Sequence, residues 1–80
     1  MSELRLDLRG LKCPLPALKT RKALGPLNPG DTILVECTDP LAAIDIPNLV
    51  RETGDVLLDT RQADGMIIFS IRKADAGKTA

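Results

Sequence analysis

Residues 8–16 read LRGLKCPLP and place a cysteine where an alternating strand pattern stops and a helix begins. Proline is favoured at the first position of a helix, because its missing N–H would have no helical partner there. Pro14 therefore indicates a helix start and puts Cys13 at the N-cap. The dipole and the free amides of a helix start favour an anion, and the anion that a cysteine supplies is the thiolate. The sequence thus predicts a reactive thiol at Cys13.

The rest of the composition limits the chemistry of Cys13. The chain has two cysteines and no histidine, so neither a Cys-x-x-Cys disulfide nor a Cys–His dyad is available. The cations Arg9, Lys12 and Lys19 are expected to favour the thiolate and to hold the Cys13 pKa below the ordinary value of about 8.5. We expect no metal site and no cofactor. A lone cysteine is also often a small buried hydrophobic residue, so its position alone leaves a structural role open.

The length and the ends of the chain indicate one small domain. Eighty residues provide a single modest core, which we place in residues 1–73, with residues 74–80 as a disordered tail. The N-terminus has no apolar signal segment, and no stretch approaches the roughly 18 apolar residues that span a bilayer. We therefore expect a cytoplasmic protein that has no membrane partner and whose two cysteines are free thiols.

The charges of the chain balance overall but are unevenly distributed. Residues 1–30 carry six basic and two acidic side chains, whereas residues 31–80 carry five basic and nine acidic ones. A basic region can mark nucleic-acid binding, but Phe69 is the single aromatic residue, so bases have no stacking platform. We interpret the basic region as a surface that docks proteins and stabilises the thiolate. A merely solvated charged face is the alternative.

The first half of the chain predicts a strand followed by a helix. Residues 4–8 alternate apolar and polar, as a half-buried strand does. The helix is predicted from Pro14 to about Leu24, because Gly25-Pro26 supplies a C-terminal glycine and a residue that cannot continue the helix. Its buried stripe avoids every charge and comprises Ala17, Thr20 and Leu24.

That choice of buried stripe leaves two leucines, Leu15 and Leu18, exposed beside the thiol. Lys19 and Lys22 lie next to them in the sequence. An apolar centre with a cationic rim is typical of a protein interface. The four residues Leu15, Leu18, Lys19 and Lys22 are therefore the predicted partner-docking surface.

The second half predicts a strand, a helical region and a hairpin. The near-continuous apolar run at 32–37 suits an interior strand. Strands at 56–59 and 66–71 flank a hairpin signal at 63–65. Between the strands at 32–37 and 56–59, apolar residues recur at helical spacing. This helical region is predicted to begin at Asp39-Pro40, with Asp39 as the N-cap and Pro40 as the first helical residue.

Pro47 interrupts the helical spacing of this second region. The sequence leaves two possibilities open, a kink at Pro47 or a short turn followed by a helix that Asp45 caps. In the second case Pro47 would fall in the first turn of the helix, where it does little harm.

These elements give the order βαβαββ and predict an α+β two-layer sandwich, a four-stranded mixed sheet with two helices on one face. Right-handed crossovers make the first two strands parallel, which brings Cys13, Cys37 and Asp39 to one end of the molecule. Cys37 shares a strand face with apolar residues and is expected in the core. The alternative is a resolving thiol that forms a disulfide with Cys13.

Three segments resemble a known family, the TusA/SirA-like sulfur carriers. They are Asp7 to Pro16 with its Cys-Pro-x-Pro motif, Thr38-Asp39-Pro40, and Asp45-Ile46-Pro47. The resemblance covers roughly residues 4–73. Cys-Pro-x-Pro alone is a weak signal, but its coincidence with the other two segments and with the βαβαββ order is specific.

The resemblance implies a sheet in which the fourth strand lies antiparallel between the second and third. It also implies a persulfide carrier rather than a stand-alone enzyme. The cysteine matching Cys13 would take a sulfane sulfur from a cysteine desulfurase or a rhodanese-like donor and relay it to an acceptor protein. Such relays serve tRNA thiolation, molybdenum cofactor assembly and sulfur metabolism, and the sequence does not distinguish these pathways.

The resemblance also assigns residues to roles. Pro14 and Pro16 would shape the helix start that presents Cys13, and five further residues would support the site or contact partners: Arg9, Gly10, Lys12, Asp39 and Asp45. Many members of the family have an acidic residue where this chain has Leu15. Two rival functions stay open, a regulatory or RNA-binding module and a Cys13/Cys37 thiol redox protein.

Overall fold

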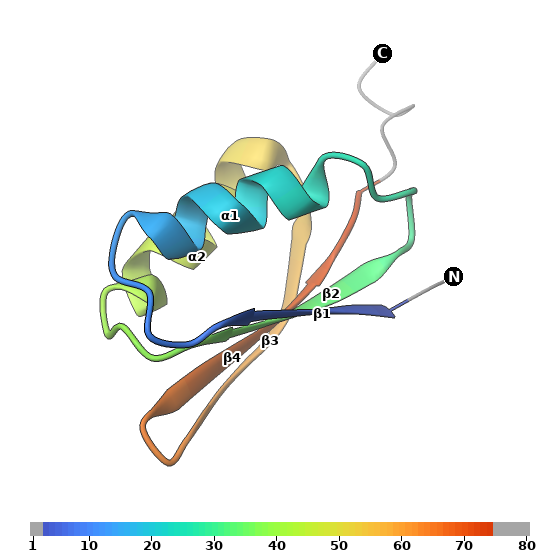
Figure 1. Cartoon of the computed structure of the whole chain (residues 1–80). Coiled ribbons are helices and arrows are strands. Elements are labelled where there is room, and N and C mark those ends of the chain that lie inside the picture. The colour runs from blue at the N-terminus through green and yellow to red at the C-terminus, as the bar shows by residue number, and fades with distance from the viewer. Residues whose placement is uncertain (1–2, 75–80) are drawn as a thin grey trace.

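Four strands and two helices follow one another in the order that the hydrophobic patterns predict. The computed structural model describes residues 3–74. Of the predicted tail at 74–80, residues 75–80 lie outside them, whereas the Ala74 amide donates a hydrogen bond to the Asp55 carboxylate at 2.9 Å. The elements are β1 (Glu3–Leu8), α1 (Leu15–Leu24), β2 (Thr32–Cys37), α2 (Ala42–Thr53), β3 (Val56–Ala63) and β4 (Met66–Arg72). Both helices lie on the same face of the sheet (Figure 1). The predicted α+β sandwich is therefore confirmed.

The sheet has the strand order β1-β2-β4-β3. β1 pairs with β2 in parallel, whereas β4 is antiparallel to both of its neighbours. A parallel pair needs a long crossover, and α1 supplies it between β1 and β2. The position of β4 between β2 and β3 confirms the expectation drawn from the family resemblance. The carboxyl ends of β1 and β2 consequently meet at one edge of the sheet.

The β3–β4 hairpin closes through Asp64 and Gly65, which both have positive φ, 53° and 74°. Two successive residues with positive φ form a tight turn whose backbone twist matches the twist of the two flanking strands. β3 extends to Ala63, four residues beyond the predicted end at 59, because residues 60–63, of which the first three are polar, continue to pair with β4 although they stay exposed.

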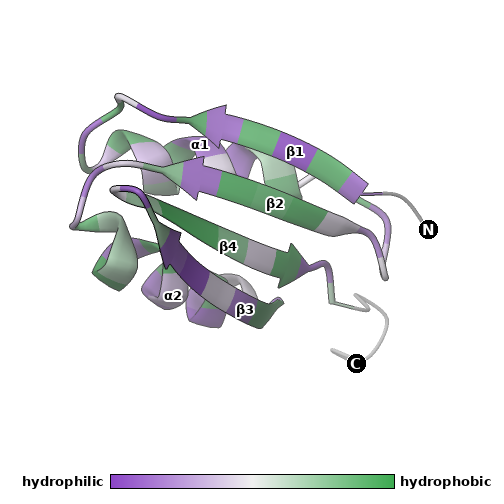
Figure 2. Cartoon of the chain, turned by 90° about the horizontal axis from the view of Figure 1, so that it is seen from below, coloured by the Kyte–Doolittle hydropathy of each residue, from purple (hydrophilic) through white to green (hydrophobic). Residues whose placement is uncertain are grey.

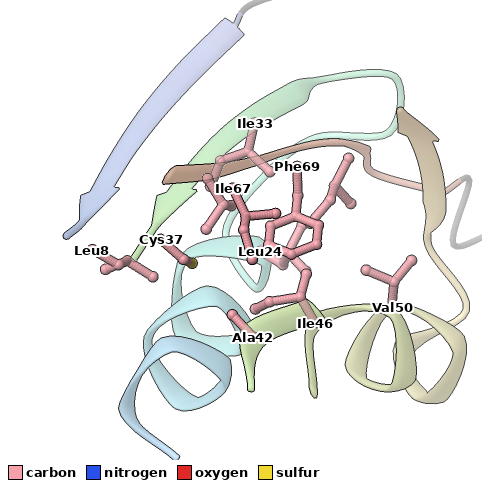
Figure 3. Close-up of a cluster of buried hydrophobic side chains, with 11 residues drawn as sticks. Leu8, Leu24, Ile33, Cys37, Ala42, Ile46, Val50, Ile67 and Phe69 are labelled. Carbon is pink, nitrogen blue, oxygen red and sulfur yellow. The ribbon is translucent and has the colours of Figure 1, made fainter. Parts of the chain in front are cut away.

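The core lies between the sheet and the helices. Alternate residues of β2 and β4 point into it, and the helix residues Leu24, Ala42, Ile46 and Val50 meet them (Figure 3). Seen from below, with the sheet in front of the helices, β1 shows the alternation of hydrophilic and hydrophobic residues from which it was predicted (Figure 2). Cys37 has no exposed surface, which confirms its predicted place in the core. Burial raises the pKa of its thiol to about 11.

We expect Cys37→Ser to destabilise the domain, because it places a hydroxyl group in an apolar environment at a cost of about 1–3 kcal/mol. For a domain of this size the melting temperature should fall by at least about 4 °C. The same substitution at the exposed Cys13 is the matched control and should leave melting unchanged. Equal melting temperatures for the two variants would contradict the burial of Cys37.

The buried stripe of α1 agrees with the prediction at two of its three positions. Thr20 and Leu24 are buried, and Pro16 completes the stripe, whereas Ala17 is only half-buried. The three buried residues are four positions apart, which places them on one face of the helix. The Thr20 hydroxyl donates a hydrogen bond to the Pro16 carbonyl oxygen at 2.7 Å. Leu15 and Leu18 are 43% and 55% exposed, as predicted.

The second helical region is a single helix that continues through Pro47, so the possibility of a short turn followed by a helix capped by Asp45 is wrong. α2 begins at Ala42 with Leu41 as its N-cap, so the predicted start with Asp39 as N-cap and Pro40 as first residue is wrong; these two residues form a turn before the helix. Asp45 does not cap this helix. Four α2 residues, Ala42, Ile46, Leu49 and Val50, are buried, and tertiary packing of an apolar face contributes more to helix stability than local propensity does. This burial stabilises the helix across Pro47. Within residues 3–74, no helix combines the length and apolarity needed to span a bilayer.

Candidate functional site

Two loops come together where β1 and β2 end. The Gly10 amide donates to the Thr38 hydroxyl oxygen at 2.8 Å, and the Cys13 amide donates to the Asp39 carboxylate at 2.6 Å. Gly10 has a φ of 85°, a backbone conformation that residues other than glycine rarely adopt. The predicted proximity of Cys13 and Asp39 is therefore confirmed. Thr38 belongs to one of the three segments that resemble the family, but its hydrogen bond with the Gly10 amide was not predicted.

The start of α1 differs in detail from the sequence prediction. Pro14 is the N-cap, and the helix runs from Leu15, so Cys13 lies one residue before the cap instead of at it. The Cys13–Pro14 peptide bond is cis. The Leu15 amide donates to the Lys12 carbonyl oxygen at 2.9 Å, so this amide does not face the sulfur. The helix start therefore stabilises a Cys13 thiolate less than the sequence suggested.

The Cys13 side chain contacts a carboxylate. Its Sγ–H donates a hydrogen bond to Oδ2 of Asp45 at 2.6 Å, which links the loop before α1 to the first turn of α2. This hydrogen bond raises the pKa of Cys13, and slight desolvation and the negative charges of Asp45 and Asp39 act in the same direction. The predicted lowering of the pKa is therefore wrong, because the neutral thiol and not the thiolate has a partner.

Two of the three cations expected to favour the thiolate, Arg9 and Lys12, act on aspartates instead. Arg9 forms a bidentate ion pair with Asp7, at 2.9 Å for each hydrogen bond, and this pair lowers the Asp7 pKa to about 2. The pKa of Asp39 is lowered by the amides of Cys13 and Leu41 and, to a smaller extent, by the charge of Lys12.

An open groove between α1 and α2 begins at the thiol. Its volume is about 310 Å³. Ala17 and Leu18 contribute from α1 and Leu49 from α2, and an ion pair between Arg21 and Glu52 crosses it at 2.8 Å. Cys13 and Asp45 both line this groove. Of its α2 wall, only Asp45 was predicted as a site residue; Asn48, Leu49 and Glu52 belong to none of the family segments and were missed.

Of the four predicted docking residues, Leu18 lines the groove, whereas Leu15, Lys19 and Lys22 do not. Leu15 and Leu18 are exposed on α1, and Lys19 and Lys22 make no ion pair within residues 3–74. Nowhere in that part of the chain do three or more Cys, Asp or Glu side chains group in a way that could hold a metal ion.

Comparison with known protein families matches residues 4–73 to the family described as Sulfurtransferase TusA. The chain belongs to this family. The Sulfur carrier protein TusA of Allochromatium vinosum is 35% identical over 69 residues, which cover 86% of this chain and 91% of that protein. A Neisseria meningitidis serogroup A protein, whose name includes the words sulfur carrier protein, is 42% identical over 72 residues, 90% of this chain and 97% of that protein. Family membership confirms the resemblance seen in the sequence.

Proposed function

We propose that this protein carries sulfane sulfur as a persulfide on Cys13, accepting it from a donor protein and relaying it to an acceptor protein. The family membership and the names of the relatives support a sulfur-carrier role. The observation that carries the assignment to Cys13 is its exposure at the open end of the α1–α2 groove, whereas Cys37 is buried. A carrier thiol must be reached by two partners, and only Cys13 can be reached without opening the core.

The transfer step is a thiol–persulfide exchange. The Cys13 sulfur attacks the terminal sulfur of the donor persulfide, a new S–S bond forms at Cys13, and the S–S bond in the donor breaks. The donor cysteine leaves as a thiolate and takes up the proton that Cys13 loses. Atoms and electrons balance without an oxidant, a reductant or a cofactor. A cysteine desulfurase or a rhodanese-like protein is the proposed donor.

The neighbouring residues support this step by fixing the loop that presents the thiol. Asp39 holds the Cys13 amide, Gly10 and Thr38 join the two loops, and Pro16 anchors the helix start in the core. The groove provides space for the additional sulfur. Arg9 and Lys12 make no bond to the thiol, so we assign them at most to contacts with a partner.

The protein is proposed to act in the cytoplasm, where reducing conditions keep both thiols free. Its acceptor would belong to a pathway such as tRNA thiolation, molybdenum cofactor assembly or sulfur metabolism. The rival redox function needs Cys37 to reach Cys13, and the burial of Cys37 does not favour it. The rival RNA-binding function has no support from Arg5, Arg9 and Arg21, each of which is paired with a carboxylate.

The direct test is mass spectrometry of the intact protein after incubation with a cysteine desulfurase and cysteine. We expect the mass of one added sulfur atom, located by peptide mapping in the fragment that contains Cys13 and released by a thiol reductant. Absence of added sulfur with both a desulfurase and a rhodanese-like donor would refute the proposal. Sulfur located on Cys37 would refute the assignment of the residue.

Charge on the docking surface should accelerate the encounter with the donor. We expect Lys19→Glu/Lys22→Glu to slow association with a desulfurase about three- to tenfold at low salt. The difference should shrink near 1 M salt, where the screening length falls to about 3 Å. Stopped-flow measurement of the association rate at several salt concentrations checks both the slowing and its salt dependence.

The matched control is Arg72→Glu/Lys73→Glu, which changes the charge equally at the opposite end of the sheet. Its association rate should exceed that of the Lys19/Lys22 variant at low salt. An equal effect of the two double variants would mean that net charge, and not this surface, governs the encounter.

A further inference from the structure

The thiol of Cys13 and its amide are each held by a carboxylate from a different segment. Asp39, in the loop after β2, accepts the amide N–H, and Asp45, on α2, accepts the thiol S–H, both at 2.6 Å. The first contact fixes the backbone, and the second fixes the side chain and its proton. A thiolate at the same position would place two negative charges in contact. The geometry therefore favours the neutral side chain.

The other charged groups near Cys13 do not offset this preference. Lys12 acts on Asp39 and not on the sulfur. Arg21 and Glu52 also line the groove, but they neutralise each other through their ion pair. Arg9 is occupied by Asp7. The charges that face the sulfur are therefore those of the two aspartates, and Asp45 makes the direct contact.

We propose that Asp45 is a positioning residue that latches the proton on Cys13, so that the free carrier presents a neutral and unreactive thiol. The inference rests on the proposed function, since it describes how the carrier behaves between donor and acceptor. The raised pKa of Cys13 agrees with this geometry. An exposed thiolate would react with small electrophiles and oxidants, whereas a latched thiol reacts when a docked partner disturbs its contact with Asp45.

The latch adds no reagent to the transfer step. When the donor docks, the Cys13 proton leaves the sulfur as the new S–S bond forms, and the departing donor thiolate accepts it. Asp45 stays a carboxylate throughout. A general-base role for Asp45 would have the opposite consequence. Removing a base would slow the reaction of the Cys13 thiol with an electrophile, whereas removing the latch would accelerate it.

The alkylation rate of Cys13 by iodoacetamide as a function of pH distinguishes these roles. In Asp45→Asn the amide has nearly the same shape but no charge, so we expect the rate at pH 7 to rise about three- to tenfold. The pH at which the rate inflects should shift downward from the wild-type value, which itself should lie above that of an ordinary cysteine. Asp45→Ala, which removes the hydrogen-bond acceptor altogether, should change the rate in the same direction.

Glu52→Gln is the matched control, because it removes the charge of another groove carboxylate that has no bond to Cys13. It should leave the rate and the inflection unchanged, and circular dichroism and melting should show that all three variants are folded. A slower or unaltered alkylation rate in both Asp45 variants would overturn the latch. An equal increase in Glu52→Gln would also overturn it, because the effect would then come from groove charge in general.

Sulfur loading of the same samples separates this inference from the proposed function. If wild-type protein loads sulfur but Asp45→Asn has an unchanged pH profile, the latch is refuted and the carrier function stands. If Asp45→Asn is alkylated faster but neither protein accepts sulfur from a desulfurase or a rhodanese-like donor, the carrier function is refuted and the proton latch stands as a property of the thiol.

Discussion

Cys13→Ser is expected to abolish sulfur loading completely and to leave the fold intact. A serine oxygen cannot form the S–S bond of a persulfide, so no sulfur should be detected on the variant after incubation with desulfurase and cysteine. The structure predicts normal folding for two reasons. The bond from the residue 13 amide to Asp39 does not involve the side chain, and a serine hydroxyl can donate to Asp45 as the thiol does.

Intact-mass spectrometry and thermal melting on the same preparation check both parts of this result. Cys37→Ser serves as the control, since its folded fraction should load sulfur normally on Cys13. Loading that persists in Cys13→Ser would transfer the chemistry to Cys37. That outcome would require the core to open, because Cys37 has no exposed surface. Loss of folding in Cys13→Ser would instead show that the thiol is needed for structure.

The sequence was sufficient for the fold wherever a local pattern and the tertiary packing agree. β2 has the predicted bounds, Thr32–Cys37, because a continuous apolar run has one favourable place in a small sandwich, the interior of the sheet. The Asp-Gly signal correctly located the hairpin. The sequence left open whether α2 runs through Pro47, because the local rule for proline favours an interruption and burial of the apolar face opposes it.

The contacts of the site also divide into one that the sequence predicted and one that it did not. The contact between Cys13 and Asp39 follows from topology, since both residues come after parallel strands that end at one edge. The contact between Cys13 and Asp45 joins residues 32 positions apart and depends on how α2 is oriented over the sheet. No local pattern contains that information. The sign of the Cys13 pKa shift was therefore wrong, because the nearby cations were visible in the sequence, whereas the resemblance named Asp45 only as a supporting residue and not as a partner of the sulfur.

Leu18→Glu is expected to reduce the rate of sulfur transfer from a desulfurase at least about tenfold, because residues at the centre of an interface contribute most through desolvation. Leu18 is 55% exposed on α1 and lines the groove that starts at Cys13. A glutamate there places a charge at the apolar centre of the docking surface. It removes little from the core, so the melting temperature should stay close to that of the wild-type protein.

Leu58→Glu is the matched control for this variant, since Leu58 is exposed to a similar degree, 47%, but lies on β3 away from the helix layer. Single-turnover sulfur transfer and thermal melting on both variants decide the outcome. If Leu18→Glu unfolds the domain, Leu18 is part of the core and the assignment of the exposed face of α1 is wrong. If it folds and transfers sulfur as fast as Leu58→Glu, the donor docks elsewhere. The remaining exposed apolar residues beside the site, Leu41 and Ile44 at the start of α2, would then be the next surface to test.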